Sequence, residues 1–172
     1  MREMKDSGME WIGEIPANWR LNKIKRSVDI INSGTTPPTG RKDYYEGTIN
    51  WVQSGDLYCK YHITDTAKCI SLKAINECSA LRIYEKDFII IAMYGASIGN
   101  VAISKINACV NQACCVVKPD KHNNLRFMYY WLAMCKSDFI RQAIGGTQPN
   151  ISQGIIKEEP YLQPVSPKKN NL

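Results

Sequence analysis

Hydrophobic positions divide the chain into short extended segments followed by one helical region. Residues 87–92 form a continuous apolar run that is rich in isoleucine and bounded by Gly95, as is typical of a buried strand. Further strands are predicted at 48–52, 101–103 and 108–117. Between 124 and 144, apolar residues recur at helical spacing, with an interruption near Lys136 and Ser137. The pattern therefore predicts a sheet packed with a helical hairpin or a kinked helix.

The two ends of the chain and one early segment have weaker patterns. Residues 1–18 contain glycine and proline without a sustained period, so we expect an N-terminal arm held by Trp11 and Ile12. Residues 19–32 carry apolar side chains at helical spacing, yet they end in an isoleucine pair like a strand, so both structures stay open. Residues 160–172 contain three prolines and a polar end, which predicts an extended exit that frays.

Polar loops separate these segments. Residues 33–40 hold two glycines and two prolines, which neither a helix nor a central strand tolerates, so an exposed loop is predicted there. Residues 54–56 form a turn after a predicted strand. Residues 145–146 are both glycine and end the helical region, 147–150 form a polar loop, and Ser152 can cap a short helix.

Composition indicates an ordinary globular protein. The 172 residues are 44% hydrophobic and 22% charged, which is enough apolar material for one packed domain over 1–172 and excludes global disorder. No apolar run approaches the ~20 residues of a membrane-spanning helix, and no signal-peptide pattern is present, so we expect no membrane association and a cytoplasmic location. Seven cysteines without a secretory signal fit reduced thiols better than disulfides.

The net charge of +6 is unevenly distributed. Residues 1–100 carry 13 basic and 12 acidic side chains, whereas 101–172 carry nine basic and four acidic ones. This surplus permits a polyanionic partner, but a solvated surface explains it equally well.

Patterns typical of nucleotide and nucleic-acid enzymes are missing from the sequence. Five residues, instead of four, separate Gly34 from Gly40, and Arg41 and Lys42 follow where a phosphate-binding loop needs Lys and then Ser or Thr. A methyltransferase of exocyclic amines needs Asn or Asp before two prolines and an aromatic residue, whereas 36–39 reads Thr-Pro-Pro-Thr. The acid and lysine pair of a magnesium-dependent nuclease occurs only in the predicted arm. We therefore expect neither catalysis nor a cofactor.

The cysteines around 109–115 could suggest a metal site. However, Cys114 and Cys115 are adjacent in a predicted strand and would point to opposite faces, so they cannot readily bind one tetrahedral ion. Buried small apolar side chains are the better interpretation, and no metal is expected.

Seven ordered blocks give the chain a recognisable pattern. They are 5–16 with Trp19, 33–37, 51–57, 93–99, 111–113, 127–130 and 146–152. In these blocks the chain resembles the target-recognition domain of type I restriction-modification DNA specificity subunits. The resemblance implies an α+β fold in which a mixed, strongly twisted β-sheet packs with helices.

The resemblance also implies a function. It is that of a non-catalytic module that reads one half of a bipartite site in double-stranded DNA and guides the methyltransferase and restriction subunits, with possible pairing to a second specificity half. After 160–164 the spacer helix of the family is absent, which puts dimerisation and methyltransferase docking in doubt. The alternative is a protein-interaction fragment that binds methyltransferase or specificity subunits without reading DNA.

The polar loops supply the candidate DNA contacts, because Arg, Lys, hydroxyl and amide side chains contact phosphates, and Arg and the amides also read base edges. The candidates are Thr36, Arg41, Lys42, Ser54, Tyr94, Thr147, Gln148, Asn150 and Ser152. For Gln148 and Asn150, base reading competes with solvent exposure and local capping. Tyr94 could equally face DNA or cap the sheet. The aromatic residues of 127–131 are predicted to be core instead of a stacking platform.

Overall fold

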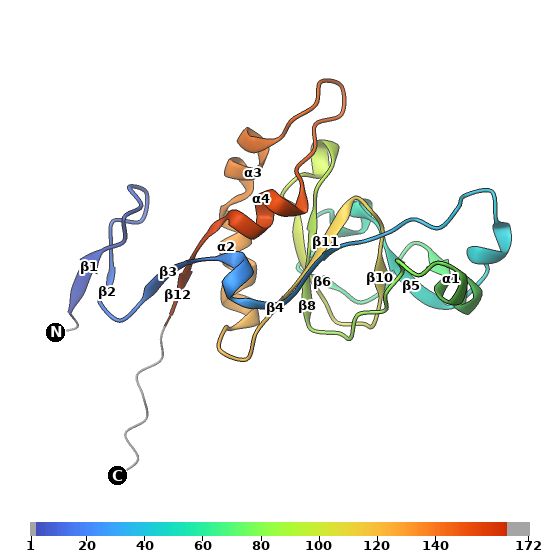
Figure 1. Ribbon diagram of the computed structural model, residues 1–172, viewed down its shortest axis with the longest axis horizontal. Helices are drawn as coiled ribbons and strands as arrows, with labels where there is room; N and C mark the ends of the chain where they lie inside the picture. The colour runs from blue at the N-terminus through green and yellow to red at the C-terminus, as the bar shows by residue number, and fades with distance from the viewer. Residues whose placement is uncertain (1–2, 165–172) are drawn as a thin grey trace, which may run out of the picture.

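The computed structural model describes residues 3–164 (Figure 1). Its centre is a five-stranded sheet. The strands, in spatial order, are β4 (Val28–Ser33), β11 (Cys114–Pro119), β8 (Phe88–Ala92), β9 (Val101–Ser104) and β6 (His62–Ile63). Neighbouring strands are antiparallel except for β6 and β9, which are parallel. All side chains of β8 are buried, as its apolar run predicted.

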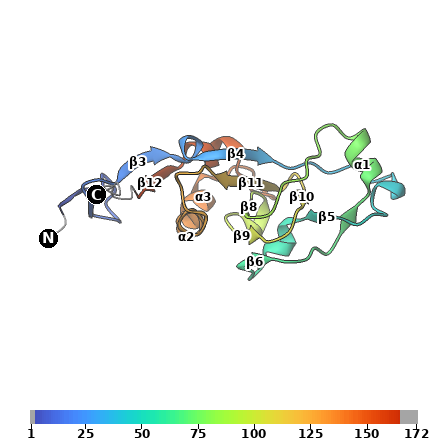
Figure 2. The same ribbon diagram turned by 90° about the horizontal axis from the view of Figure 1, so that it is seen from below.

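Both faces of this sheet are covered. Because side chains alternate along a strand, Ile89 and Ile91 of β8 join one core cluster while Ile90 joins another. The same alternation places Cys115 in the first cluster and Cys114 in the second, which confirms that their side chains lie on opposite faces. Figure 2 shows α2 (Leu125–Met134) and α3 (Lys136–Gln142) on one side of the sheet. The strands β5 (Ile49–Val52) and β10 (Cys109–Val110) lie on the other side, together with α1 (Leu72–Glu77).

The helical region packs on the first face as two consecutive helices, α2 (Leu125–Met134) and α3 (Lys136–Gln142). Asn124 caps α2, since its Oδ1 accepts hydrogen bonds from the backbone N–H groups of Arg126 and Phe127. Cys135 alone separates the two helices, so of the two predicted arrangements the structure contains the kinked helix. Met128 and Trp131 are buried, which confirms that most of the aromatic segment is core, although Tyr130 is exposed.

A smaller lobe covers the second face. It contains β5 (Ile49–Val52), β10 (Cys109–Val110), β7 (Cys69–Ile70), α1 (Leu72–Glu77) and the 3-10 turn η2 (Lys42–Tyr44). In it β5 lies between β10 and β7. Two further 3-10 turns, η3 (Ser54–Leu57) and η4 (Gly95–Ser97), follow β5 and β8.

The N-terminal arm is more structured than its sequence predicted. It forms a hairpin of β1 (Met4–Asp6) and β2 (Glu14–Pro16), because its glycines make turns between two extended pieces. Trp11 contacts Trp131 with 5.8 Å between ring centroids, and Ile12 packs partly buried against the main core. Ile15, which the sequence did not single out, is the buried anchor of the arm.

The segment 19–32, for which helix and strand stayed open, is extended. It consists of β3 (Arg20–Lys23), the 3-10 turn η1 (Ile24–Arg26) and then β4. The exit strand β12 (Pro160–Gln163) pairs with β3, and α4 (Gln153–Glu158) precedes it. The predicted fraying of 165–172 lies outside the described residues. No helix within 3–164 is long and apolar enough to span a membrane.

Candidate nucleic-acid interface

Polar loops gather at one end of the five-stranded sheet. Strands β4 and β8 are both antiparallel to β11, so they run parallel to each other, and their C-terminal ends lie beside the start of β11. The register fixes this proximity, since Ser33 pairs with Cys115 and Ala92 pairs with Cys114. We call this the loop end of the sheet. In Figure 1 the turn after β8 and the loop before α4 lie at the top of the molecule.

The loop after β4 is held against the start of β11. The Gly34 N–H donates to the Cys114 carbonyl at 3.0 Å, and the Thr35 N–H donates to the Val110 carbonyl at 3.0 Å. A Cβ atom on Gly34 would lie 2.1 Å from the Val110 carbonyl oxygen, so only glycine allows this approach. The prediction of an exposed loop is therefore only half right: Pro37 is buried, and the loop becomes exposed from residue 38.

A cleft of about 360 Å³ opens beside this loop. Its lining residues are Thr36, Thr39, Tyr45, Trp51, Gln53, Lys68, Asn111 and Gln112. The Trp51 indole Nε1 donates to the Thr35 carbonyl at 3.2 Å, and the Tyr45 hydroxyl donates to the Pro37 carbonyl at 2.6 Å. Thr36 is thus held between two anchored neighbours at the rim of the cleft.

Rigid turns present the amides of this cleft. The Asn111 N–H donates to the Val52 carbonyl at 2.9 Å, and its side-chain oxygen accepts from the Ala113 N–H at 3.1 Å. Gln112 is therefore the exposed tip of a tight turn between β10 and β11. The Gln53 N–H donates to the Asp56 carboxylate at 2.8 Å, which fixes the start of η3 and places Ser54 next to the cleft.

Asn111 and Gln112 were not predicted from the sequence to be contact residues. Asn111 and Gln112 were visible only as a short polar turn within one block of the family pattern, because their proximity to Gln53 depends on the parallel pairing of β10 with β5.

The loop before α4 packs on the turn after β8. The Gly95 N–H donates to the Pro149 carbonyl at 2.8 Å, and the Ile151 N–H donates to the Met93 carbonyl at 2.9 Å. Five of the predicted contact residues meet here: Tyr94, Thr147, Gln148, Asn150 and Ser152. Thr36 follows the end of β4 at this end of the sheet, and Ser54 is next to Gln53, which lines the same cleft as Thr36.

These five residues differ in how free their side chains are. Thr147 and Gln148 are exposed, and Tyr94 is about one third exposed at 36%. The Asn150 backbone forms both hydrogen bonds of a bridge with Ile144, at 2.8 and 3.0 Å, and its side chain is only partly exposed. The Ser152 hydroxyl accepts from the Ile155 N–H at 3.3 Å, so it is the predicted cap of α4.

Gln153 ties the two halves of the loop end together. Its side-chain Nε2 donates to the Ile31 carbonyl at 2.5 Å, and its Oε1 accepts from the Ser33 hydroxyl at 3.3 Å. The start of α4 is therefore fixed to the last residues of β4.

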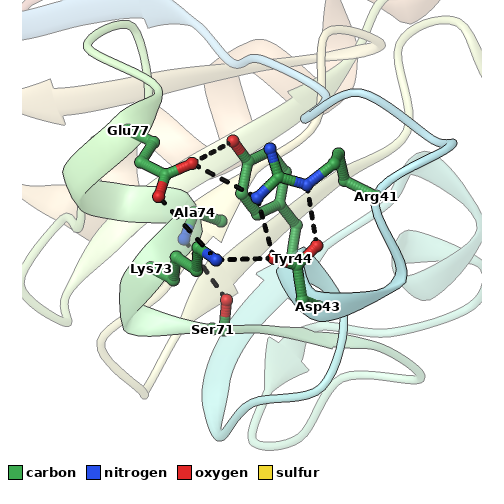
Figure 3. A network of polar contacts seen from close by, with 7 residues as sticks. All are labelled: Arg41, Asp43, Tyr44, Ser71, Lys73, Ala74 and Glu77. Atoms are coloured by element: carbon green, nitrogen blue, oxygen red, sulfur yellow. Dashed lines mark hydrogen bonds and ion pairs between the residues drawn. The ribbon is translucent and has the colours of Figure 1, made fainter.

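Arg41 and Lys42 lie apart from this group, in the smaller lobe. Figure 3 shows the Arg41 guanidinium bound to both Asp43 oxygens, at 2.9 and 2.8 Å, while it also reaches Glu77. Lys73 approaches the same Asp43 carboxylate at 2.9 Å. Hydrogen bonds from Arg41, and to a lesser extent from Lys73, hold the pKa of Asp43 well below its usual range. Arg41 thus fastens η2 to α1, whereas the Lys42 side chain is exposed.

Four of the seven cysteine side chains are buried, namely Cys109, Cys114, Cys115 and Cys135. Within residues 3–164, no three His, Cys, Asp or Glu side chains come close enough to hold an ion. Burial raises the pKa of Cys115 to about 12, and it raises the pKa of Cys114 further still. Both thiols therefore stay protonated and pack as small buried apolar side chains.

Comparison with known proteins places this arrangement in a family. The profile of the type I restriction modification DNA specificity domain matches residues 16–164. The chain belongs to this specificity-domain family. It is similar to the type I restriction enzyme MjaIX specificity subunit of Methanocaldococcus jannaschii, with 34% identity over 164 residues. The match covers 92% of the chain and 37% of that subunit.

Solved structures agree on the fold of this specificity domain. A chain from a structural study of complex assembly and conformational transition in the type I R-M system superposes with a TM-score of 0.69 and 18% identity, covering 94% of the domain and 37% of that chain. The HsdS subunit of Thermoanaerobacter tengcongensis gives 0.67 and 16%, covering 94% and 36%. At these identities the comparison confirms the predicted α+β fold and is silent on individual contacts.

Proposed function

We propose that this specificity domain recognises one half of a bipartite sequence in double-stranded DNA and contributes that recognition to a type I restriction-modification assembly. In this role the chain is non-catalytic and acts in the cytoplasm. The methyltransferase and restriction subunits of the assembly supply the chemistry, and a second specificity half supplies the rest of the target. The chain spans 37% of the length of the relative it matches.

The observation that carries this proposal is the convergence of polar loops at one end of the sheet. Strand register brings the ends of β4 and β8 to the same edge of the sheet, so the loop that carries Thr36 and the turn on which the loop of Gln148 packs both start there. Ser54 follows Gln53, which lines the same cleft as Thr36. Amide and hydroxyl side chains on a rigid sheet can hydrogen-bond base edges and phosphates together. The family match supports a DNA partner for this surface.

Among the loop residues, we assign Gln148 to base reading and Lys42 to the phosphates. Gln148 is exposed in the loop that packs on the turn after β8, where an amide can make paired hydrogen bonds to a base. Lys42 is exposed in the other lobe, where its charge can attract any duplex. Asn150 is the weaker of the two amide candidates, because its side chain is only partly exposed and its own backbone is fixed in the bridge with Ile144.

Selection of duplexes from a randomised pool tests the proposal. We expect the chain to enrich one short sequence and to bind weakly with steep salt dependence, because one small domain makes few contacts. Gln148→Ala should relax the sequence choice at a cost of ~1 to 3 kcal/mol, while Lys42→Ala should weaken all duplexes alike and lower the salt slope by ~1. Failure of the wild-type chain to enrich any sequence, alone or with its methyltransferase, would contradict the proposal.

A further inference from the structure

A groove lined by cations runs along the free edge of β4. Its volume is about 660 Å³, and its lining residues are Lys25, Val28, Asp29, Ile30, Ile31, Asn32, Arg82, Ile83, Tyr84 and Lys157. Three of these side chains are basic and one is acidic. None of the residues of this groove was a candidate contact in the sequence, because η1, β4, the segment before β8 and α4 meet only in the folded chain.

The cations of the groove differ in how they are neutralised. Lys25 shares the Glu158 carboxylate with Lys23, and these two lysines lower the pKa of Glu158 to about 2. Within residues 3–164, neither Arg82 nor Lys157 has an ion-pair partner within 4.0 Å. Two positive charges therefore remain available to an anion from outside the chain.

Their positions are set by the same contacts that build the loop end. Gln153 hydrogen-bonds the Ile31 carbonyl, and Lys157 follows it by one helical turn on α4, so both side chains lie on the face of α4 that meets β4. Arg82 belongs to the segment that enters β8 on the other side of the groove. Asn32 and Tyr84 both line the groove, so that segment lies against β4.

The floor of the groove adds a backbone donor. β4 is an end strand of its sheet, so only one of its edges pairs with β11. The Ile31 carbonyl accepts from Gln153, so it points away from β11. In an antiparallel pair the N–H and the carbonyl of one residue point to the same side, so the Ile31 N–H also points away from β11. This backbone N–H and the two cationic side chains line the same groove, and together they form a set of donors that suits a phosphate group.

We propose that this groove binds the phosphate backbone of the duplex whose bases face the loop end. The inference rests on the proposed DNA recognition and adds to it a separate, sequence-independent contact. The groove adjoins the loop end directly, since its residue Asn32 is followed by Ser33 and the loop that carries Thr36. Five residues of β4 extend over about 16 Å, at ~3.3 Å per residue, and one DNA strand places a phosphate every ~3.4 Å along the helix axis. Arg82 and Lys157 are thus the phosphate-contacting residues of a strand that leaves the loop end along β4.

The experiment measures duplex affinity across a range of salt concentrations for the full chain and its variants. Each phosphate contact contributes about 0.9 to the slope of log K against log salt, so Arg82→Ala and Lys157→Ala should each reduce the slope by ~0.9 and the double variant by ~1.8. Over the tenfold range from 1 M to 0.1 M salt, these slope changes correspond to affinity losses of about 8-fold and about 60-fold at 0.1 M, relative to the wild type. Arg82→Lys and Lys157→Arg should keep the slope, and the selected sequence should be unchanged in all four single variants.

Lys60→Ala is the matched control. Lys60 is an exposed lysine near β6, at the opposite edge of the sheet, and it pairs with Asp65 at 3.2 Å. Its removal lowers the net charge by the same amount, so the groove is supported only if the slope falls more for Arg82→Ala and Lys157→Ala than for this control. Equal slopes for all three would overturn the inference, as would a changed consensus sequence, while thermal unfolding verifies that each variant is folded. A wild-type chain that binds every duplex alike would count against the proposed sequence recognition. The salt slopes of the variants would still show whether the groove binds phosphate groups.

Discussion

Replacement of Gly34 by alanine tests whether the loop end depends on close backbone approach. The added Cβ would meet the Val110 carbonyl oxygen at 2.1 Å and the Asn111 carbonyl oxygen at 2.3 Å, and both are backbone atoms that cannot rotate away. The loop must therefore move, and the hydrogen bonds from Gly34 to Cys114 and from Thr35 to Val110 would break. Overpacking costs ~1 to 3 kcal/mol and each hydrogen bond contributes ~0.5 to 1.5 kcal/mol, so we expect a loss of about 2 to 6 kcal/mol in the free energy of unfolding.

Gly40→Ala supplies the control in the same loop. Nothing lies within 4 Å of a Cβ at Gly40, so this change should leave stability nearly unaltered. Urea unfolding followed by circular dichroism measures the free energy of unfolding of both variants. In thermal unfolding, a loss of 3 kcal/mol should lower the melting temperature by roughly 6 to 12 °C in a domain of this size. The Gly34 variant should also lose sequence selection, because Thr36 is carried by the displaced loop. Equal stability of the two variants would refute the argument from close approach.

Two further predictions concern titratable groups in the core. Burial raises the pKa of Glu159 above its value of about 4.5 in the unfolded chain, so ionisation of this carboxyl opposes folding. The free energy of unfolding of the wild type should therefore fall as the pH rises from below 4.5 through the pKa of Glu159 in the folded chain. Glu159→Gln should remove this loss, so the melting temperature of the variant should gain on that of the wild type between pH 4 and pH 8; a constant difference would contradict the assignment. Iodoacetamide at pH 8 should modify the exposed Cys59 in the native chain and reach Cys114 and Cys115 only after unfolding, because burial keeps those thiols protonated and covered. Peptide mapping that finds native alkylation of Cys115 would argue against the buried placement.

Local patterns in the sequence were sufficient for the elements that depend on neighbouring residues. The isoleucine run of β8, the opposite faces of Cys114 and Cys115, and the Ser152 cap of α4 all follow from periodicity or capping over a few positions. The same reasoning placed Thr147 and Gln148 in a polar loop. Side-chain alternation and helix capping are short-range effects, so the sequence determines them directly.

Segments of mixed pattern were decided by their tertiary partners. The helical spacing within 19–32 gave way to strands because β3 pairs with β12 and β4 pairs with β11, and these partners lie far along the chain. The arm was expected to be irregular, yet Ile15 reaches the main core and its hairpin forms around that anchor. Burial against a distant surface outweighed the weak local preference in both segments.

The composition of the candidate interface was likewise decided by strand order and register. Arg41 has the chemistry of a phosphate contact, but the fold places Asp43 and Glu77 around its guanidinium and uses it to hold η2 on α1. Gln112 was visible only as part of a short polar turn, and the groove cations Arg82 and Lys157 carried no local signal. These residues became candidates because the pairing of distant strands brings the segments that carry them to shared edges. The sequence by itself determined which side chains could contact DNA. Only the pairing of distant strands decided which of them face solvent together, because such pairing depends on contacts that no short window of residues contains.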